Sequence, residues 1–251
     1  MKRKLAILLI VAVVLIIALF SCGGRGILYL NPIKGVPQAS IDWVDFVKLK
    51  NNQYTGLHNA IIADPALVTD EVVGEVKFKV ADIVTNASYR IQPGDAAYLD
   101  IGTKLYRVEG YDTSVLIAAI DERSINGYRL YVANDQRDPF KTSFSEGMKK
   151  NIEKIEWYIL EDGKAPLVVL DAARSNELVT LLQEGEPKLS SNNNNGYQQN
   201  YYKLYIFNGE PIAYSYTMLD NGLQVLFYGY DEPVVLDESI REWMNHFQAV
   251  H

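Results

Sequence analysis

The amino-acid sequence predicts an α+β fold. A β-rich N-terminal module, either a twisted sheet or a small barrel, precedes a ββ-α-βββ-α module whose helices cover one sheet face. Three observations support this prediction. Residues 41–135 hold six candidate strands and few helical patterns. Residues 155–247 combine strand patterns with two segments of helical period. The chain has 251 residues, 48% hydrophobic and 22% charged, which is enough for a substantial core.

The chain begins with the pattern of an export signal. The first four residues include three basic ones, and the 16 residues from Leu5 to Phe20 are all apolar. The only cysteine, Cys22, follows in "LFSCGG", which is similar to the bacterial lipobox. We therefore expect a signal peptide over residues 1–21 and a lipid anchor at Cys22, because two acyl chains hold a protein stably at a membrane. The alternative is an uncut N-terminal membrane helix, since 16 residues lie between the two usual lengths.

Both interpretations place the rest of the chain at the outer face of the cell membrane. That part contains no cysteine, which excludes disulfides from it. Without the three basic residues of segment 1–21, the 24 Lys and Arg fall to 21 against 31 acidic residues, a net charge of −10. Such a charge argues against nucleic acid as a partner, because Lys and Arg contacts to phosphate dominate that binding. It also repels anionic lipid headgroups, so the predicted membrane partner is reached through the anchor at Cys22.

Residues 22–40 are irregular and contain several Gly and Pro, which predicts a tether of roughly 25 Å. The β-rich module then covers residues 41–140. Its candidate strands are apolar or alternating runs at 42–49, 54–62, 71–83, 103–111, 114–122 and 128–133. Asn126-Gly127, between the last two, predicts a two-residue hairpin, because both positions of a type I′ turn need positive φ.

The second module covers residues 150–251. Its elements are a hairpin over 155–170, a helix over 175–185, a three-stranded meander over 201–228 and a helix over 237–247. Ser175 is the expected N-cap of the first helix. The last helix has an apolar stripe at the i, i+3, i+4, i+7 spacing of one buried face.

The meander is dense in tyrosine and supplies the candidate binding surface. If Asn208-Gly209 is a two-residue turn, Tyr201 lies opposite Tyr216 and Lys203 opposite Tyr214, all on one face. The candidate surface comprises Tyr201, Lys203, Tyr205, Tyr214 and Tyr216. Tyrosine suits a partner surface because its ring is apolar and its hydroxyl is wet. The alternative is that tyrosine is only a favourable strand residue here.

Few residues suggest catalysis. No zinc-hydrolase, serine-hydrolase, P-loop, dinucleotide-binding or calcium-loop motif occurs in the sequence. The three histidines, His58, His246 and His251, are interpreted as structural. We predict no catalytic residue, metal ligand or cofactor, and the sequence favours binding over catalysis. Two alternatives stay open: a wall hydrolase with two carboxylates in a deep cleft, and a small-molecule sensor or carrier with an enclosed apolar pocket.

Several longer segments carry a family resemblance. They are the lipobox, "DWVDFVKL", "GEVKFKVAD", "GDAAYLDIGTKLYRVEGY" and "WYILEDGKAPLVVLDAARSNELVTLL". Over nearly its whole length the chain resembles uncharacterised lipoproteins of Bacillus- and Paenibacillus-type Gram-positive bacteria. The resemblance implies the outer face of the plasma membrane and no particular activity. We expect a lipid-anchored binding protein whose partner is another envelope protein or a wall component.

Overall fold

The computed structural model describes residues 41–141, 143–147, 151–159, 165–187 and 199–248. The predicted signal peptide, Cys22 and the predicted tether lie outside these residues. Strands dominate the described part, and the α+β class expected from the sequence is confirmed. Within it, no helix is both long and apolar enough to cross a membrane.

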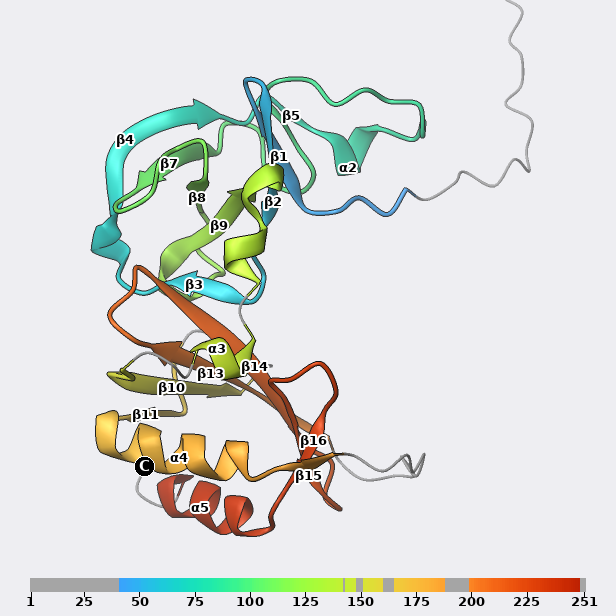
Figure 1. Cartoon of the computed structure of the whole chain (residues 1–251). Coiled ribbons are helices and arrows are strands. Elements are labelled where there is room, and N and C mark those ends of the chain that lie inside the picture. Colours follow the sequence, from blue (N-terminus) through green and yellow to red (C-terminus); the bar gives the residue numbers. More distant parts are fainter. Residues whose placement is uncertain (1–40, 142, 148–150, 160–164, 188–198, 249–251) are drawn as a thin grey trace, which may run out of the picture. The chain divides into compact units, whose positions relative to one another are not determined.

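The first sheet is built almost entirely from antiparallel pairs. Its strand order is β4-β7-β8-β9-β2-β1-β6-β5, and only β5 and β6 pair in parallel. The strands are β1 (Phe46–Leu49), β2 (Asn52–Gly56), β4 (Val68–Glu75), β5 (Phe78–Lys79), β6 (Asp95–Ala96), β7 (Lys104–Val108), β8 (Leu116–Ile120) and β9 (Tyr128–Ala133). Short helical turns connect them or follow them: η1 (Pro65–Leu67), α2 (Val80–Ile83), η2 (Ile125–Gly127), η3 (Asn134–Gln136), η4 (Asp138–Phe140) and α3 (Phe144–Gly147). Figure 1 shows β4 curling over the sheet beside β7.

The second sheet has the order β11-β10-β13-β14-β15-β16-β12, and β3 pairs with β14 beside this path. Its strands are β3 (Ala60–Ile62), β10 (Lys154–Ile159), β11 (Val168–Leu170), β12 (Glu186–Pro187), β13 (Asn200–Phe207), β14 (Ile212–Asp220), β15 (Val225–Tyr228) and β16 (Val234–Leu236). Two longer helices, α4 (Ala172–Gln183) and α5 (Ser239–Gln248), lie along one face of this sheet (Figure 1).

The expected single strand over 54–62 is wrong, because its two halves belong to different sheets. The backbone N–H of Leu57 still donates to Leu130 in the first sheet, at 2.8 Å. Two residues later, Asn59 accepts from the N–H of Ser215 in the second sheet, also at 2.8 Å. We call Leu57–Asn59 the crossing segment. The strand-like composition runs through it, but the hydrogen-bond partners change from one sheet to the other.

Residues 71–83 are also not one strand. They form the end of β4, the two-residue β5 and the turn of α2. The pairing of β4 with β7 has register shifts between Val68 and Gly74, so the alternation is already irregular there. Val80, which is fully buried, begins α2. Local apolar alternation did not reveal this break, since the buried residues continue across it.

The positive φ angles predicted for Asn126 and Gly127 are confirmed, but the predicted two-residue length of the connection is wrong. Both residues have positive φ, 60° and 76°. However, Ile120 pairs with Tyr128, so the connection spans residues 121–127. The N–H of Asp121 donates to the carbonyl of Gly127 at 2.9 Å and closes this longer loop.

The first long helix begins earlier than expected. The cap is Asp171, whose carboxylate accepts from the N–H of Arg174 at 2.9 Å. Ser175 lies one turn inside the helix, fully buried, and its hydroxyl donates to the carbonyl of Leu170. Ser175 is therefore not the N-cap.

The register expected for the meander is wrong. Tyr205 pairs with Ser215 and Ile206 with Tyr214, a shift of three residues from the expected pairing of Tyr205 with Ile212. Asn208 and Gly209 take part in a connection of four residues, 208–211, instead of a two-residue turn. An odd shift exchanges the two faces of β14. It moves Tyr214 and Tyr216 to the opposite face from Lys203 and Tyr205.

Candidate functional site

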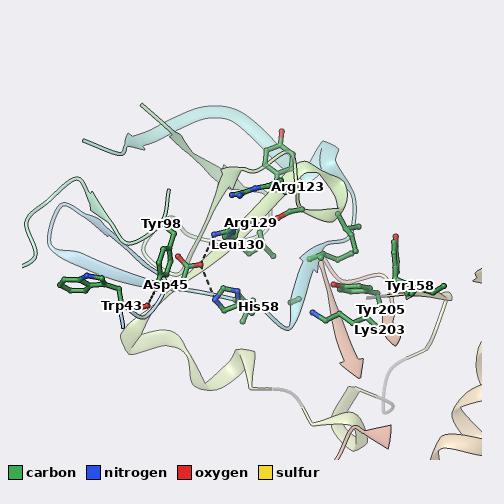
Figure 2. Close-up of a pocket in the computed structure, with 17 residues that line it drawn as sticks. Trp43, Asp45, His58, Tyr98, Arg123, Arg129, Leu130, Tyr158, Lys203 and Tyr205 are labelled. Carbon is green, nitrogen blue, oxygen red and sulfur yellow. Dashed lines mark hydrogen bonds and ion pairs between the residues drawn. The ribbon is translucent and has the colours of Figure 1, made fainter. Parts of the chain in front are cut away.

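A pocket between the two sheets lies at the crossing segment. This main pocket has a volume of about 580 Å³ and receives side chains from both sheets. Asp45, Arg129 and Tyr128 come from the first sheet or the segment before it, and Tyr158, Lys203 and Tyr205 from β10 and β13. Figure 2 shows the two groups facing each other across His58.

A buried carboxylate forms the centre of the first wall. Only 5% of the Asp45 side chain is exposed, so its charge requires compensation. The hydroxyl of Tyr131 donates to its Oδ1 at 3.1 Å, and Nη1 of Arg129 lies 3.4 Å from its Oδ2. Nε2 of His58 approaches the same oxygen at 3.5 Å, while 67% of the His58 side chain stays exposed. Asp45 thus connects a buried network with a solvent-facing imidazole.

Gly56 makes room for this carboxylate. It lies opposite Tyr131 in the β2–β9 ladder, and its N–H donates to the carbonyl of Asp45 at 2.9 Å. A Cβ at this position would come within 2.5 Å of Oδ2 of Asp45 and 3.1 Å of Nε2 of His58. The absence of a side chain at Gly56 therefore permits the Asp45–His58 contact.

Arg129 extends the network to a second buried acid. Its Nη2 lies 2.6 Å from Oδ2 of Asp121, whose other oxygen accepts from Nε of Arg123 at 3.3 Å. Burial acts to raise the pKa of Asp121, but hydrogen bonds from the Arg123 amide and the charge of Arg129 hold it below its usual range. Burial and the charge of Asp45 raise the pKa of Tyr131, which keeps its hydroxyl a donor. Each of the two buried acids therefore contacts Arg129 and at least one further donor.

The opposite wall carries a lysine without a counter-ion. Lys203 is half-buried on β13, and no carboxylate of the described residues lies within ion-pair distance of it. Its ammonium group points toward the His58 side of the pocket (Figure 2). Burial lowers the pKa of Lys203. The neighbouring Tyr158 donates instead to Glu156, at 2.8 Å, and its ring meets that of Tyr205 edge-on at 5.4 Å.

Two further hollows adjoin the crossing segment. A second pocket of about 610 Å³ shares His58 and Lys203 with the main pocket. Its other lining residues are mainly hydroxyl-bearing side chains, namely Ser143, Ser215, Tyr216, Thr217, Tyr228 and Tyr230. A third, of about 280 Å³, shares His58, Asn59 and Lys141 with the second. The crossing segment therefore borders all three.

The five residues of the expected tyrosine surface do not form one surface. Lys203 and Tyr205 line the main pocket, and Tyr205 is only 5% exposed. Tyr201 is exposed near the end of β13. Tyr216 lies on the opposite face of β14 and packs edge-on against Phe144, although it also lines the second pocket together with Lys203. Tyr214 lies half-buried on the same face as Tyr216. The surface was expected from a register that the structure does not have.

The sequence prediction missed most of the site. His58 was interpreted as structural, and Asp45, Arg123 and Arg129 were not selected. One signal was present for Arg129, a charged residue in the otherwise apolar strand "YRLYVA". No local signal joins it to Asp45, which lies 84 positions away.

The described residues contain no group of three or more His, Cys, Asp or Glu side chains placed to hold a metal ion. Comparison of the chain with models of known families, with curated proteins and with solved structures finds no match. The pockets that meet at the crossing segment are therefore the main evidence on function.

Proposed function

We propose that this chain is a lipid-anchored binding protein of the cell envelope, held at the outer face of the cell membrane through Cys22. The main and second pockets are its ligand-binding groove. Support for the location comes from the N-terminal pattern and from the lipoprotein resemblance. Each of the two predicted modules, 41–140 and 150–251, then supplies one wall of the groove. The exception is β3, which comes from the first module but pairs with β14 of the second sheet.

A single observation carries the binding proposal: the Asp45–Arg129–Asp121 network is buried beside an open groove. Buried ion pairs are costly and add little stability on average, so they are weak candidates for a purely structural role. Here they place Arg129 on a groove wall between two buried carboxylates, with Nε2 of His58 3.5 Å from one of them. A few fixed polar groups among aromatic residues are typical of a ligand site.

The geometry supports binding over the two alternatives. A hydrolase needs a carboxylic acid with a raised pKa, whereas the pKa of Asp121 is held low by its basic partners. A carrier of apolar small molecules needs an enclosed pocket lined by apolar side chains. The main pocket is lined by charged as well as aromatic side chains, and His58 is largely exposed to solvent.

Photo-crosslinking in the native membrane tests the proposal. A photoreactive residue at Ser124, on the rim of the main pocket, should trap a discrete adduct from its own envelope. The matched control is Val169, which is 54% exposed on β11 and does not line these pockets. Identical adducts at both positions, or none at Ser124, would reject the groove as the binding site.

The anchor is tested separately. Cys22→Ala should release the chain from the membrane fraction and remove the lipid mass from the mature protein. If the variant stays in the membrane and wild type carries no lipid, the uncut N-terminal helix is the correct interpretation.

A further inference from the structure

We propose that the ligand is an elongated acidic oligosaccharide that crosses from the main pocket to the second pocket, with one phosphate or carboxylate group held between Lys203 and His58. This inference rests on the proposed function and names the ligand class for the same groove. Three features support it: the positive charge of the groove, the two residues shared by both pockets, His58 and Lys203, and the polar and aromatic lining of each pocket.

The charge of the groove is opposite to that of the chain. The chain carries 31 acidic and 24 basic residues. The main and second pockets, which form the groove, are lined by four Lys and Arg residues and by two acids, Asp45 and Asp231. The four are Arg123, Arg129, Lys141 and Lys203. A basic groove in an acidic protein attracts anions locally, while the remaining surface repels them.

Within this groove, Lys203 is the cation best placed to bind a ligand anion. Arg129 is already shared by Asp45 and Asp121, and Lys141 pairs with Asp138 at 2.6 Å. Lys203 has no acidic partner among the described residues and is half-buried. Burial without a counter-ion costs free energy, and the lowered pKa of Lys203 reflects this cost. An incoming anion would remove the cost.

The position of Lys203 and His58 requires an elongated ligand. Both residues line the main pocket and the second pocket, so the anion site lies where the two meet. Only a ligand longer than one pocket uses this junction and both hollows. Nε2 of His58 lies 3.5 Å from Oδ2 of Asp45, so the imidazole stands between this buried carboxylate and the junction of the two pockets.

The outer parts of the groove fit sugar rings. Tyr98 lines the main pocket and Tyr228 the second, and they are 40% and 42% exposed, so both leave aromatic surface accessible for contact with a sugar ring. The hydroxyls of Ser143, Ser215 and Thr217 in the second pocket suit a polyhydroxyl chain. An acidic peptide would more commonly pair with an exposed strand edge. Here β14, which contributes Ser215 and Thr217, already pairs with β3, β13 and β15.

The test measures binding to the full-length protein in detergent micelles. The probes are a short phosphodiester-linked oligosaccharide, a uronic-acid oligosaccharide, a neutral oligosaccharide of equal length and a poly-glutamate peptide of equal charge. Tight binding of either acidic sugar, with weaker binding of the other two, supports the proposal, and the better acidic sugar identifies the anion. Equal or tighter binding of the neutral sugar or the peptide overturns it.

Lys203→Met should weaken binding of the preferred acidic sugar by at least about tenfold, because a half-buried charge contact is lost. Lys203→Arg should keep most of the affinity. Lys104→Met removes an exposed lysine on β7, outside the pockets, and should change nothing. Unchanged affinity in a folded Lys203→Met variant rejects the anion site.

The two proposals fail differently. If the Ser124 adduct forms but its amount does not depend on Lys203, only the ligand class is wrong. If Ser124 traps nothing and no acidic sugar binds, the groove itself is not the functional site.

Discussion

The two faces of the second sheet are built from alternate residues of the same strands, and their environments differ. Trp157, Leu204 and Met218 lie on one face, packed with the apolar side chains of α4 and α5. Lys203 and Glu156 lie on the other face, which borders the groove. The helix-covered face is a core and stabilises the protein by removing apolar area from water. The groove face keeps polar groups: Glu156 pairs with Lys154 and Tyr158, whereas Lys203 has no acidic partner among the described residues.

This difference predicts that substitutions on the helix-covered face reduce stability, and that substitutions around the groove, on either sheet, reduce ligand binding as well.

Trp157→Ala should lower the free energy of unfolding by about 3–5 kcal/mol, since it leaves a large cavity in the core. Trp157 is 2% exposed and stacks on Trp243 with ring centroids 5.8 Å apart. Trp157→Phe should cost much less, because it also removes an indole N–H that has no hydrogen-bond partner among the described residues. Chemical denaturation measures both. A small loss for Trp157→Ala would show that this face is not the core.

Arg129→Met should cost about 3 kcal/mol of unfolding free energy, because it leaves two buried carboxylates without their shared cation. Both side chains are nearly buried, Asp45 at 5% and Asp121 at 6% exposure. The adduct at Ser124 should also disappear, unlike in Trp157→Phe. Full stability with an unchanged adduct would show that the network supports neither fold nor groove.

Gly56→Ala should cost about 2 kcal/mol, since the added methyl overlaps Oδ2 of Asp45 and forces the carboxylate to move. Crosslinking at Ser124 should fall because His58 loses its contact with Asp45. Gly102→Ala measures backbone strain without crowding, because a Cβ there meets nothing within 4 Å but the residue has a φ of 88°. If only Gly102→Ala destabilises the protein, the crowding argument fails.

Arg241→Met should cost about 1–2 kcal/mol and alter the response to acid. Nε and Nη2 of Arg241 contact the two oxygens of Asp220 at 3.0 and 2.9 Å, which joins α5 to β14. Burial acts to raise the pKa of Asp220, but Arg241 and the Gly222 amide hold it below its usual range. The unfolded chain then binds more protons, so this stabilisation is present above the ordinary Asp pKa and is lost as pH falls through the lowered one.

Unfolding at a series of acidic pH values checks this prediction. The wild type should lose stability more steeply than Arg241→Met between the ordinary and the lowered pKa of Asp220. Ligand binding should not change, because this pair does not line the pockets. Parallel pH profiles would contradict the assignment.

Several elements were predictable because their signals are local. The strand over 128–133 was found with its bounds, and the helix over 237–247 overlaps α5 (Ser239–Gln248). Ile240 and Met244 of its apolar stripe are buried as the spacing predicts. Helical period and strand alternation depend on neighbours in the chain, so one sequence suffices to detect them.

Faces and registers were not predictable in the same way. Asn208-Gly209 contains the residues of a tight turn, but Asn208 instead accepts from the N–H of Glu210 within a four-residue loop. Pro211, at the end of this loop, offers its carbonyl to Ala63 beside β3. A distant strand therefore helps to set the loop conformation, and the loop sets the register.

The sequence by itself determined the α+β class, most strand and helix positions and the excess of acidic over basic residues. The lipid anchor at Cys22 remains a prediction from the sequence. Only the tertiary structure decided which residues share a surface. Residues 54–62 begin in the first sheet and end in the second. Asp45 lies beside Arg129, and Tyr214 lies on the opposite face of the second sheet from Lys203. The physical reason is that secondary structure follows local periodicity, whereas a binding groove depends on strand pairing between distant segments.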